Sequence, residues 1–107
     1  MKEDKLTNIK NKINLSVMYS LLDRATKKMR GITADLDEDN LLTIKMFFDS
    51  DLLDEEEEEM QIANTEVVAD FFNDFKDIYL DLLVVPVSIN IYDQKGNLGW
   101  FYLRREY

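Results

Sequence analysis

The stretch RGITADLDEDNLLTIKMFFD, residues 30–49, decides the fold, because it predicts two strands joined by a polar turn. Apolar residues take every second position on both sides of DEDN: Ile32, Ala34 and Leu36 before it, and Leu42, Ile44, Met46 and Phe48 after it. An apolar period of two on both sides of a polar turn is typical of a β-hairpin. Thr43, Lys45 and Phe47 then face the other side of the sheet.

The segment before the hairpin carries a helical pattern. Apolar residues recur there at spacings of three or four: Leu6, Ile9, Ile13, Val17, Leu21, Ala25 and Met29. Ser16 can cap a helix start, basic residues favour its carboxyl end, and Gly31 is a natural stop. We therefore expect a helix over residues 16–30, with residues 1–15 either flexible or, over 3–15, an extension of it.

A second helix is expected after the hairpin, in DLLDEEEEEMQIANTEVVADFF, residues 51–72. Ser50 or Asp51 can cap it, and the six acids that follow suit the positive pole of a helix. Met60, Val67 and Phe71 form its apolar stripe. Its end is left open, near Asn73 or towards Leu80.

The last quarter of the chain predicts a second hairpin. Val85, Val87, Ile89 and Ile91 alternate with polar residues and Pro86, DQKGN supplies a turn, and LGWFYLRRE returns. The expected fold is a single α+β domain over residues 1–107, in the order α-β-β-α-β-β. We expect a four-stranded antiparallel sheet of two hairpins, with both helices on one face.

Composition argues against an enzyme. The chain has 107 residues without histidine or cysteine, which removes the commonest general base, the commonest zinc ligand and thiolate chemistry. No phosphate-binding loop or dinucleotide motif occurs. The sequence therefore predicts a non-enzymatic protein without a cofactor, and the absence of cysteine favours a reducing cytoplasm.

Acidic residues are concentrated in the middle of the chain. Residues 31–83 hold 17 acidic and two basic side chains, whereas residues 1–30 hold three acidic and eight basic ones. Such a density of carboxylates repels nucleic acid and anionic membranes and attracts cationic proteins. We therefore expect a basic protein partner, and neither nucleic acid nor membrane.

The turn DLDEDN also resembles the start of a calcium loop, with Asp35, Asp37 and Asp39 at alternate positions. The sixth position, which should be glycine, is Asn40, and the twelfth, which should be glutamate, is Met46. The interpretation is a hairpin turn and no metal site. Asp37, Glu38 and Asp39 are kept as candidate contacts for a basic partner.

One edge of the second helix is acidic. At 100° per residue, one side of that helix collects Glu55, Glu59, Glu66, Asp70 and Asp74. A solvated helix face would explain them, but like charges four residues apart destabilise an isolated helix, which favours a docking role. These five residues are candidate partner contacts.

Aromatic residues offer an alternative surface. If Phe101 and Leu103 face the core, Trp100 and Tyr102 face away, beside Tyr92. Cross-strand aromatic pairs stabilise sheets, and Trp and Tyr also anchor interfaces. The alternative function is an adaptor or homo-oligomer that associates through the outer sheet face, with Phe47 also on it.

The chain resembles a known group of bacterial proteins. The hairpin RGITADLDEDNLLTIKMFFD, the helix NTEVVADF and the closing GWFYLRRE, together with the order of elements, are similar to immunity proteins of polymorphic toxins of the contact-dependent growth inhibition type. The resemblance covers residues 16–107. It implies a protein that is encoded beside its toxin, binds the toxin domain, often a nuclease, and blocks it in the producing cell. Toxin-facing positions differ between such proteins, so no binding residue is carried over.

Overall fold

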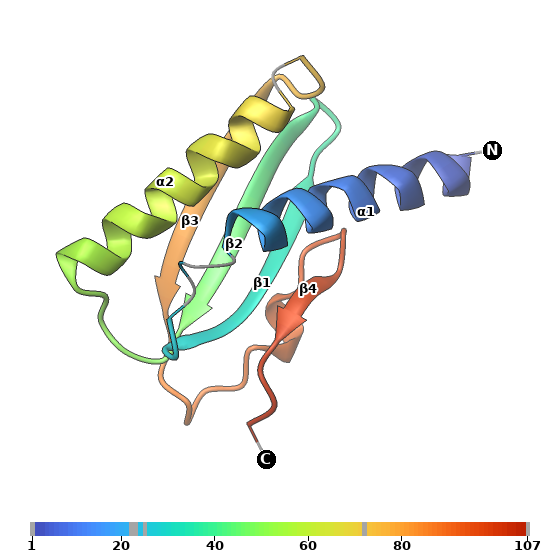
Figure 1. Cartoon of the computed structure of the whole chain (residues 1–107). Coiled ribbons are helices and arrows are strands. Elements are labelled where there is room, and N and C mark those ends of the chain that lie inside the picture. Colours follow the sequence, from blue (N-terminus) through green and yellow to red (C-terminus); the bar gives the residue numbers. More distant parts are fainter. Residues whose placement is uncertain (1, 22–23, 25, 72, 107) are drawn as a thin grey trace.

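The computed structural model describes residues 2–21, 24, 26–71 and 73–106, with side chains from Thr7 onward. Within these residues the protein contains two α-helices, a short 3-10 helix and a four-stranded sheet (Figure 1). The elements are α1 (Lys2–Ser20), β1 (Met29–Leu36), β2 (Leu41–Phe48), α2 (Asp54–Asp70), β3 (Asp77–Val84), the short 3-10 helix η1 (Tyr92–Gln94) and β4 (Trp100–Leu103). Both α-helices lie over the same face of the sheet (Figure 1).

The first hairpin is confirmed. β1 and β2 pair antiparallel from Met29↔Phe48 to Leu36↔Leu42. The carboxylate of Asp37 closes the turn, because its Oδ1 accepts hydrogen bonds from the N–H groups of Asp39 and Leu41, both at 2.9 Å. Asn40 takes the left-handed backbone conformation, with φ of 65°.

The prediction of an all-antiparallel sheet built from two hairpins is wrong. The strand order is β3-β2-β1-β4, and β3 runs parallel to β2. After β2 the chain crosses the helical face as α2 and returns in the same direction, which is the connection that adjacent parallel strands require. β4 then pairs antiparallel with β1 at the opposite edge.

The segment 85–91, predicted as a strand, is not one in the structure. The strand instead lies directly before this segment in the chain, as β3, where Ile78, Leu80 and Leu82 pack against the core. Pro86 has no N–H for a ladder. The carbonyls of Val85 and Pro86 instead accept hydrogen bonds from the guanidinium of Arg30, at 2.9 and 3.1 Å.

The bounds of the helices differ from the prediction. α1 includes the predicted extension and ends at Ser20, whereas Met29 and Arg30 begin β1 and Gly31 is a strand residue. Ser16 lies inside α1, so it is not a cap. α2 begins after Leu53 and ends at Asp70, so it does not persist towards Leu80. The N–H of Leu53 donates to Oε1 of Glu56 at 2.8 Å, which satisfies a group at the helix start in place of Ser50 or Asp51.

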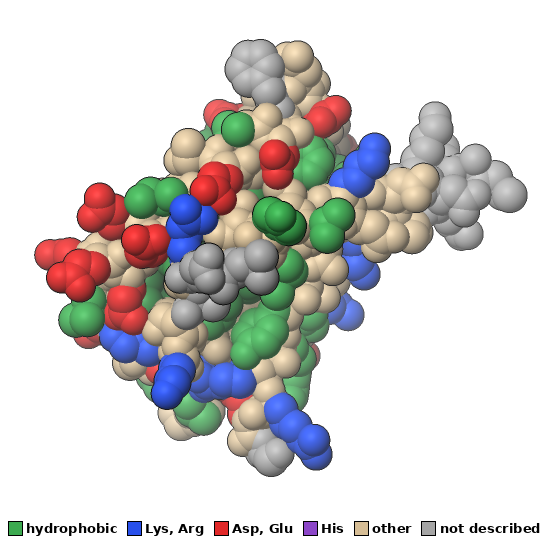
Figure 2. All heavy atoms as spheres, in the orientation of Figure 1, with side chains coloured by type: hydrophobic (Ala, Val, Ile, Leu, Met, Phe, Trp, Pro, Cys, Tyr) green, Lys and Arg blue, Asp and Glu red, His purple; other side chains and the backbone are tan. Residues whose placement is uncertain are grey.

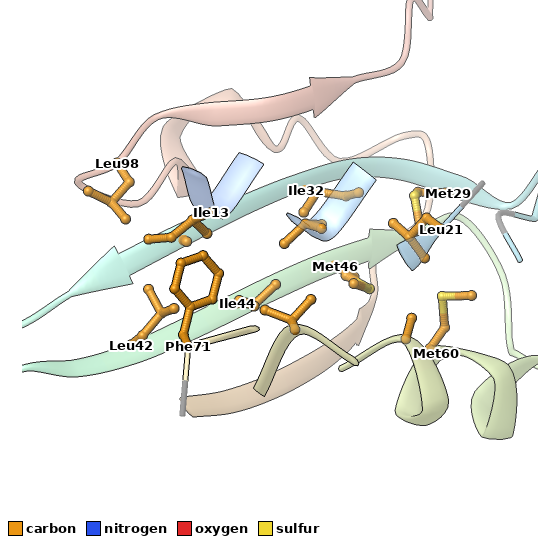
Figure 3. Packing of buried hydrophobic residues seen from close by; sticks show 14 of the residues in the cluster. Ile13, Leu21, Met29, Ile32, Leu42, Ile44, Met46, Met60, Phe71 and Leu98 are labelled. Carbon is orange, nitrogen blue, oxygen red and sulfur yellow. The ribbon is translucent and has the colours of Figure 1, made fainter. Parts of the chain in front are cut away.

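The core lies between the sheet and the two helices (Figure 3). The predicted stripes supply it: Ile13 and Val17 from α1 and Leu21 just after it, Met60 and Val67 from α2 and Phe71 just after it, and Ile32, Ala34, Leu42, Ile44, Met46 and Phe48 from the sheet. Leu98 adds to the cluster from the loop before β4. The side chain of Leu6, and Ala25, lie outside the described residues.

The opposite face of the sheet is partly covered by the chain that links β3 to β4. The hydroxyl of Thr33 accepts a hydrogen bond from the Gly96 N–H at 2.8 Å and donates to the Gly99 carbonyl at 2.6 Å. Phe47 is completely buried and its ring meets that of Trp100, with centroids 5.7 Å apart. The linking chain and Trp100 of β4 therefore cover the part of this face that contains Thr33 and Phe47.

Candidate functional site: an acidic edge and a groove between the helices

The predicted contact residues fall into three separate places. Glu55, Glu59, Glu66 and Asp70 lie on α2 and are exposed; we call these four residues the acidic edge. Asp37, Glu38 and Asp39 lie in the β1–β2 turn, and Asp74 lies beyond the end of α2. Tyr92 lies in η1, and Trp100 and Tyr102 lie in β4. The structure therefore does not form one surface from the whole predicted set.

The acidic residues gather over α2, on the left of the view in Figure 2. Asp74 is not part of the acidic edge, because α2 ends at Asp70. Its backbone carbonyl instead accepts a hydrogen bond from the side-chain amide of Asn40 at 2.9 Å, which ties it to the β1–β2 turn. The turn acids are exposed at the surface, but the Asp37 carboxylate is engaged in holding the turn.

Part of the acidic edge is neutralised within the chain. Arg24 donates to Glu59 at 3.1 Å and to Glu66 at 2.9 Å. These hydrogen bonds and charges raise the pKa of the Arg24 guanidinium, the Glu66 hydrogen bond being the largest cause. The edge is therefore less negative than the sequence suggests, and its exposed ion pairs add little stability.

Glu56 is used differently from its neighbours in the acid run. It accepts hydrogen bonds from Lys28 at 2.7 Å, from the Leu53 N–H and from the Thr26 hydroxyl, both at 2.8 Å. The Lys28 hydrogen bond, followed by those of Leu53 and Thr26, lowers the pKa of Glu56 to about 2. This carboxylate fixes the start of α2 and joins it to the chain before β1, so it has a structural role.

A groove of about 560 Å³ lies between α1 and α2, beside the acidic edge. Its lining comes from both helices and the residue after α2: Lys12, Leu15, Ser16, Tyr19, Ser20, Glu66, Asp70 and Phe71. The hydroxyl of Ser16 donates to the Asp70 carboxylate at 2.5 Å and links the two helices across it. Figure 2 shows hydrophobic side chains on this face, between the acids of α2 and the basic residues nearby.

Sequence reasoning missed the apolar side of this groove. Leu15 is 70% exposed and Tyr19 is 74% exposed, although both are large hydrophobic residues. They lie four residues apart on α1 and outside its core stripe, so they are neighbours on an outward face. The sequence did contain an indication of this surface, because two large apolar residues lie four positions apart outside the core stripe.

The aromatic candidates do not form one face. Trp100 is opposite Thr33 on the covered side of the sheet, but Tyr102 is opposite Ile32 and packs against the core. The register shifts between these two pairs, as at a β-bulge, so Trp100 and Tyr102 point to different sides. The prediction that both face away from the core is wrong for Tyr102.

Comparison with known protein families identifies the chain. The model of the MafI2 immunity protein family matches residues 10–106, nearly the whole chain. The chain belongs to this family. The resemblance to immunity proteins of the polymorphic-toxin type is thereby confirmed, and the match includes both helices of the groove from residue 10 onward. No curated protein matches the chain.

Membership of the MafI2 immunity protein family implies a toxin partner, in agreement with the expectation of a protein partner. Within the described residues, no helix is both long and apolar enough to cross a membrane. The same part of the chain contains no group of three or more acidic side chains arranged to hold a metal ion.

Proposed function

We propose that this MafI2-family protein binds the toxin domain encoded beside it and blocks that domain in the cytoplasm of the producing cell. The observation that carries the proposal is the family match over residues 10–106. The acidic edge of α2 supports a basic partner surface, since opposite charges speed association and favour correct pairing. A nuclease is the toxin class that suits it best, because a nuclease site is basic in order to hold phosphates.

Glu55, Glu59 and Glu66 provide the first test of the docking surface. Changing all three to glutamine removes three exposed negative charges along one side of α2. A matched control changes Asp77, Asp81 and Asp93, also exposed, to asparagine, so that both variants have the same net charge. The exposed Arg24 ion pairs lost in the first variant cost little stability.

The measurement is the association rate with the toxin domain encoded beside this gene, inactivated at its catalytic residue, at several salt concentrations. We expect the α2 variant to associate about tenfold more slowly and with a weaker salt dependence, since steering by charges acts on the association rate. The control variant should associate like the unchanged protein. Equal rates for the two variants would reject the acidic edge as the docking surface.

The active toxin domain tests the function itself. We expect the purified protein to stop its degradation of DNA or RNA at a one-to-one ratio. A toxin that binds the protein but cleaves no nucleic acid would refute the nuclease assignment and leave neutralisation standing. A toxin domain that does not bind at all would reject the proposed function.

A further inference from the structure

The groove between α1 and α2 combines two features that a folded monomer does not require. Leu15 and Tyr19 form an exposed apolar pair on α1, and Asp70 stands opposite them on α2. Among the large hydrophobic residues that the structure describes, these two are the most exposed. Exposed apolar surface beside polar residues marks interaction sites in soluble proteins.

The charges around the groove single out Asp70. Glu66 is paired with Arg24 at 2.9 Å, and Lys12 lines both the groove and the adjoining smaller hollow of about 140 Å³, which Asp74 also lines. Among the described residues, Asp70 accepts a hydrogen bond only from the Ser16 hydroxyl and forms no ion pair. Its carboxylate is therefore oriented by Ser16 and retains capacity to accept from a partner.

Tyr19 and Leu15 limit what can occupy the space beside that carboxylate. An occupant must place apolar atoms against the two side chains and a positive group at Asp70. Lysine and arginine both cover apolar surface with their stems while their charged ends stay polar. Arginine fits better, because its planar guanidinium stacks on an aromatic ring and binds a carboxylate through two parallel hydrogen bonds.

We propose that the groove receives one arginine side chain of the toxin domain, with its stem between Leu15 and Tyr19 and its guanidinium on Asp70. This inference rests on the proposed function and adds to it. The acidic edge attracts the toxin from a distance, whereas the groove anchors it after contact. An anchor of this kind slows dissociation, and arginine is among the residues that carry most of the affinity at interfaces.

The test compares three groove variants, Leu15→Ser, Tyr19→Ser and Asp70→Asn, with three matched controls elsewhere on the surface. The controls are Val87→Ser, Ile89→Ser and Asp81→Asn, at positions that are also exposed. Calorimetric titration with the inactivated toxin domain gives the dissociation constant of each. We expect each groove variant to bind at least about tenfold more weakly, each control to change by less than about twofold, and Tyr19→Phe to retain affinity.

An alanine scan of the toxin's surface arginines then identifies the occupant. One Arg→Ala change should weaken binding to the unchanged protein yet have almost no further effect on binding to Asp70→Asn. Circular dichroism on heating checks that every variant is folded. An anchor that tolerates Arg→Lys in the toxin without loss of affinity would overturn the choice of arginine.

The outcomes separate the two proposals. If Leu15→Ser and Tyr19→Ser bind the toxin as tightly as the unchanged protein, the groove inference is wrong, while neutralisation and the acidic edge stand. If the unchanged protein does not bind the toxin, the proposed function fails and the groove inference falls with it.

Discussion

Replacing Glu106 with glutamine should destabilise the fold strongly, although the residue lies at the end of the chain. Glu106 accepts two hydrogen bonds of 2.7 Å from Arg30, which is only 1% exposed, and a third of 3.0 Å from Arg104. The same Arg30 guanidinium donates to the carbonyls of Val85 and Pro86. One buried cation thus joins the start of β1, the exit from β3 and the carboxyl-terminal segment after β4.

The size of the stability loss follows from the interactions that Arg30 keeps in the Glu106→Gln variant. A glutamine amide accepts through one oxygen and carries no charge, so the buried Arg30 guanidinium loses its ion pair with Glu106. Removing one member of a buried pair costs about 3–5 kcal/mol. Because Arg30 keeps two carbonyl acceptors and the Glu106 side chain is 10% exposed, we expect about 2–3 kcal/mol. For a domain of this size that lowers the midpoint of heat unfolding by roughly 10–20 °C.

The assay is urea unfolding at pH 7, with Glu59→Gln as the control. Glu59 also pairs with an arginine, but its side chain is 50% exposed, so that variant should lose less than about 1 kcal/mol. A Glu106→Gln protein as stable as the Glu59→Gln control would refute the reasoning that Arg30 depends on Glu106. Unchanged slopes of the unfolding curves confirm that the two values are comparable.

Two further predictions concern the same fold. Gly96→Ala should lose at least about 2 kcal/mol in the same urea assay, because a Cβ at Gly96 would lie 2.1 Å from the carbonyl oxygen of Ala34, which is backbone and cannot yield easily. Stability should also fall between about pH 5 and pH 2. The hydrogen bond from Lys28 lowers the pKa of Glu56 to about 2, and the hydrogen bond from Arg30 does the same for Glu106. Both carboxylates therefore stabilise the fold above their unfolded pKa, and this contribution is lost as they are protonated. Urea midpoints at pH 7, 4 and 3 measure this loss, and a midpoint that does not change over this range would contradict the sign.

The hairpin β1–β2 could be predicted from the sequence because everything that specifies it is local. Alternating apolar residues and a four-residue turn with Asp37 and Asn40 fix both strands and their register. The stripes of α1 and α2 are equally local: Ile13 and Val17 of the first and Met60 and Val67 of the second are buried as predicted, whereas Met29 belongs to β1. The predicted ends of the elements were wrong, because hydrogen bonds to residues distant in the sequence determine where each element begins and ends.

β3 shows why the sheet could not be derived in the same way. Its letters DIYLDLLV alternate, but the acids at Asp70, Asp74, Asp77 and Asp81 also recur at the three- and four-residue spacing of a helix. The structure resolves the ambiguity through pairing with β2, where Leu42 lies opposite Ile78 and Ile44 opposite Leu80. Two parallel strands are not joined by a short turn, so no local sequence pattern predicts their pairing.

The candidate site was predictable in its charge and not in its shape. The acids of α2 are evident in the sequence, whereas the groove depends on the packing of two helices whose contact, such as the hydrogen bond between Ser16 and Asp70, 54 positions apart, the sequence does not show. Arg30 illustrates the opposite error, since the first helix was expected to extend to residue 30, whereas Arg30 lies in β1 and is buried. Leu15 and Tyr19 were missed because they lie outside the apolar stripe that predicts the core-facing side of the helix. Because the fold leaves both side chains largely exposed, they add little to the core, and covering such an apolar pair is the role that the proposed toxin contact gives them.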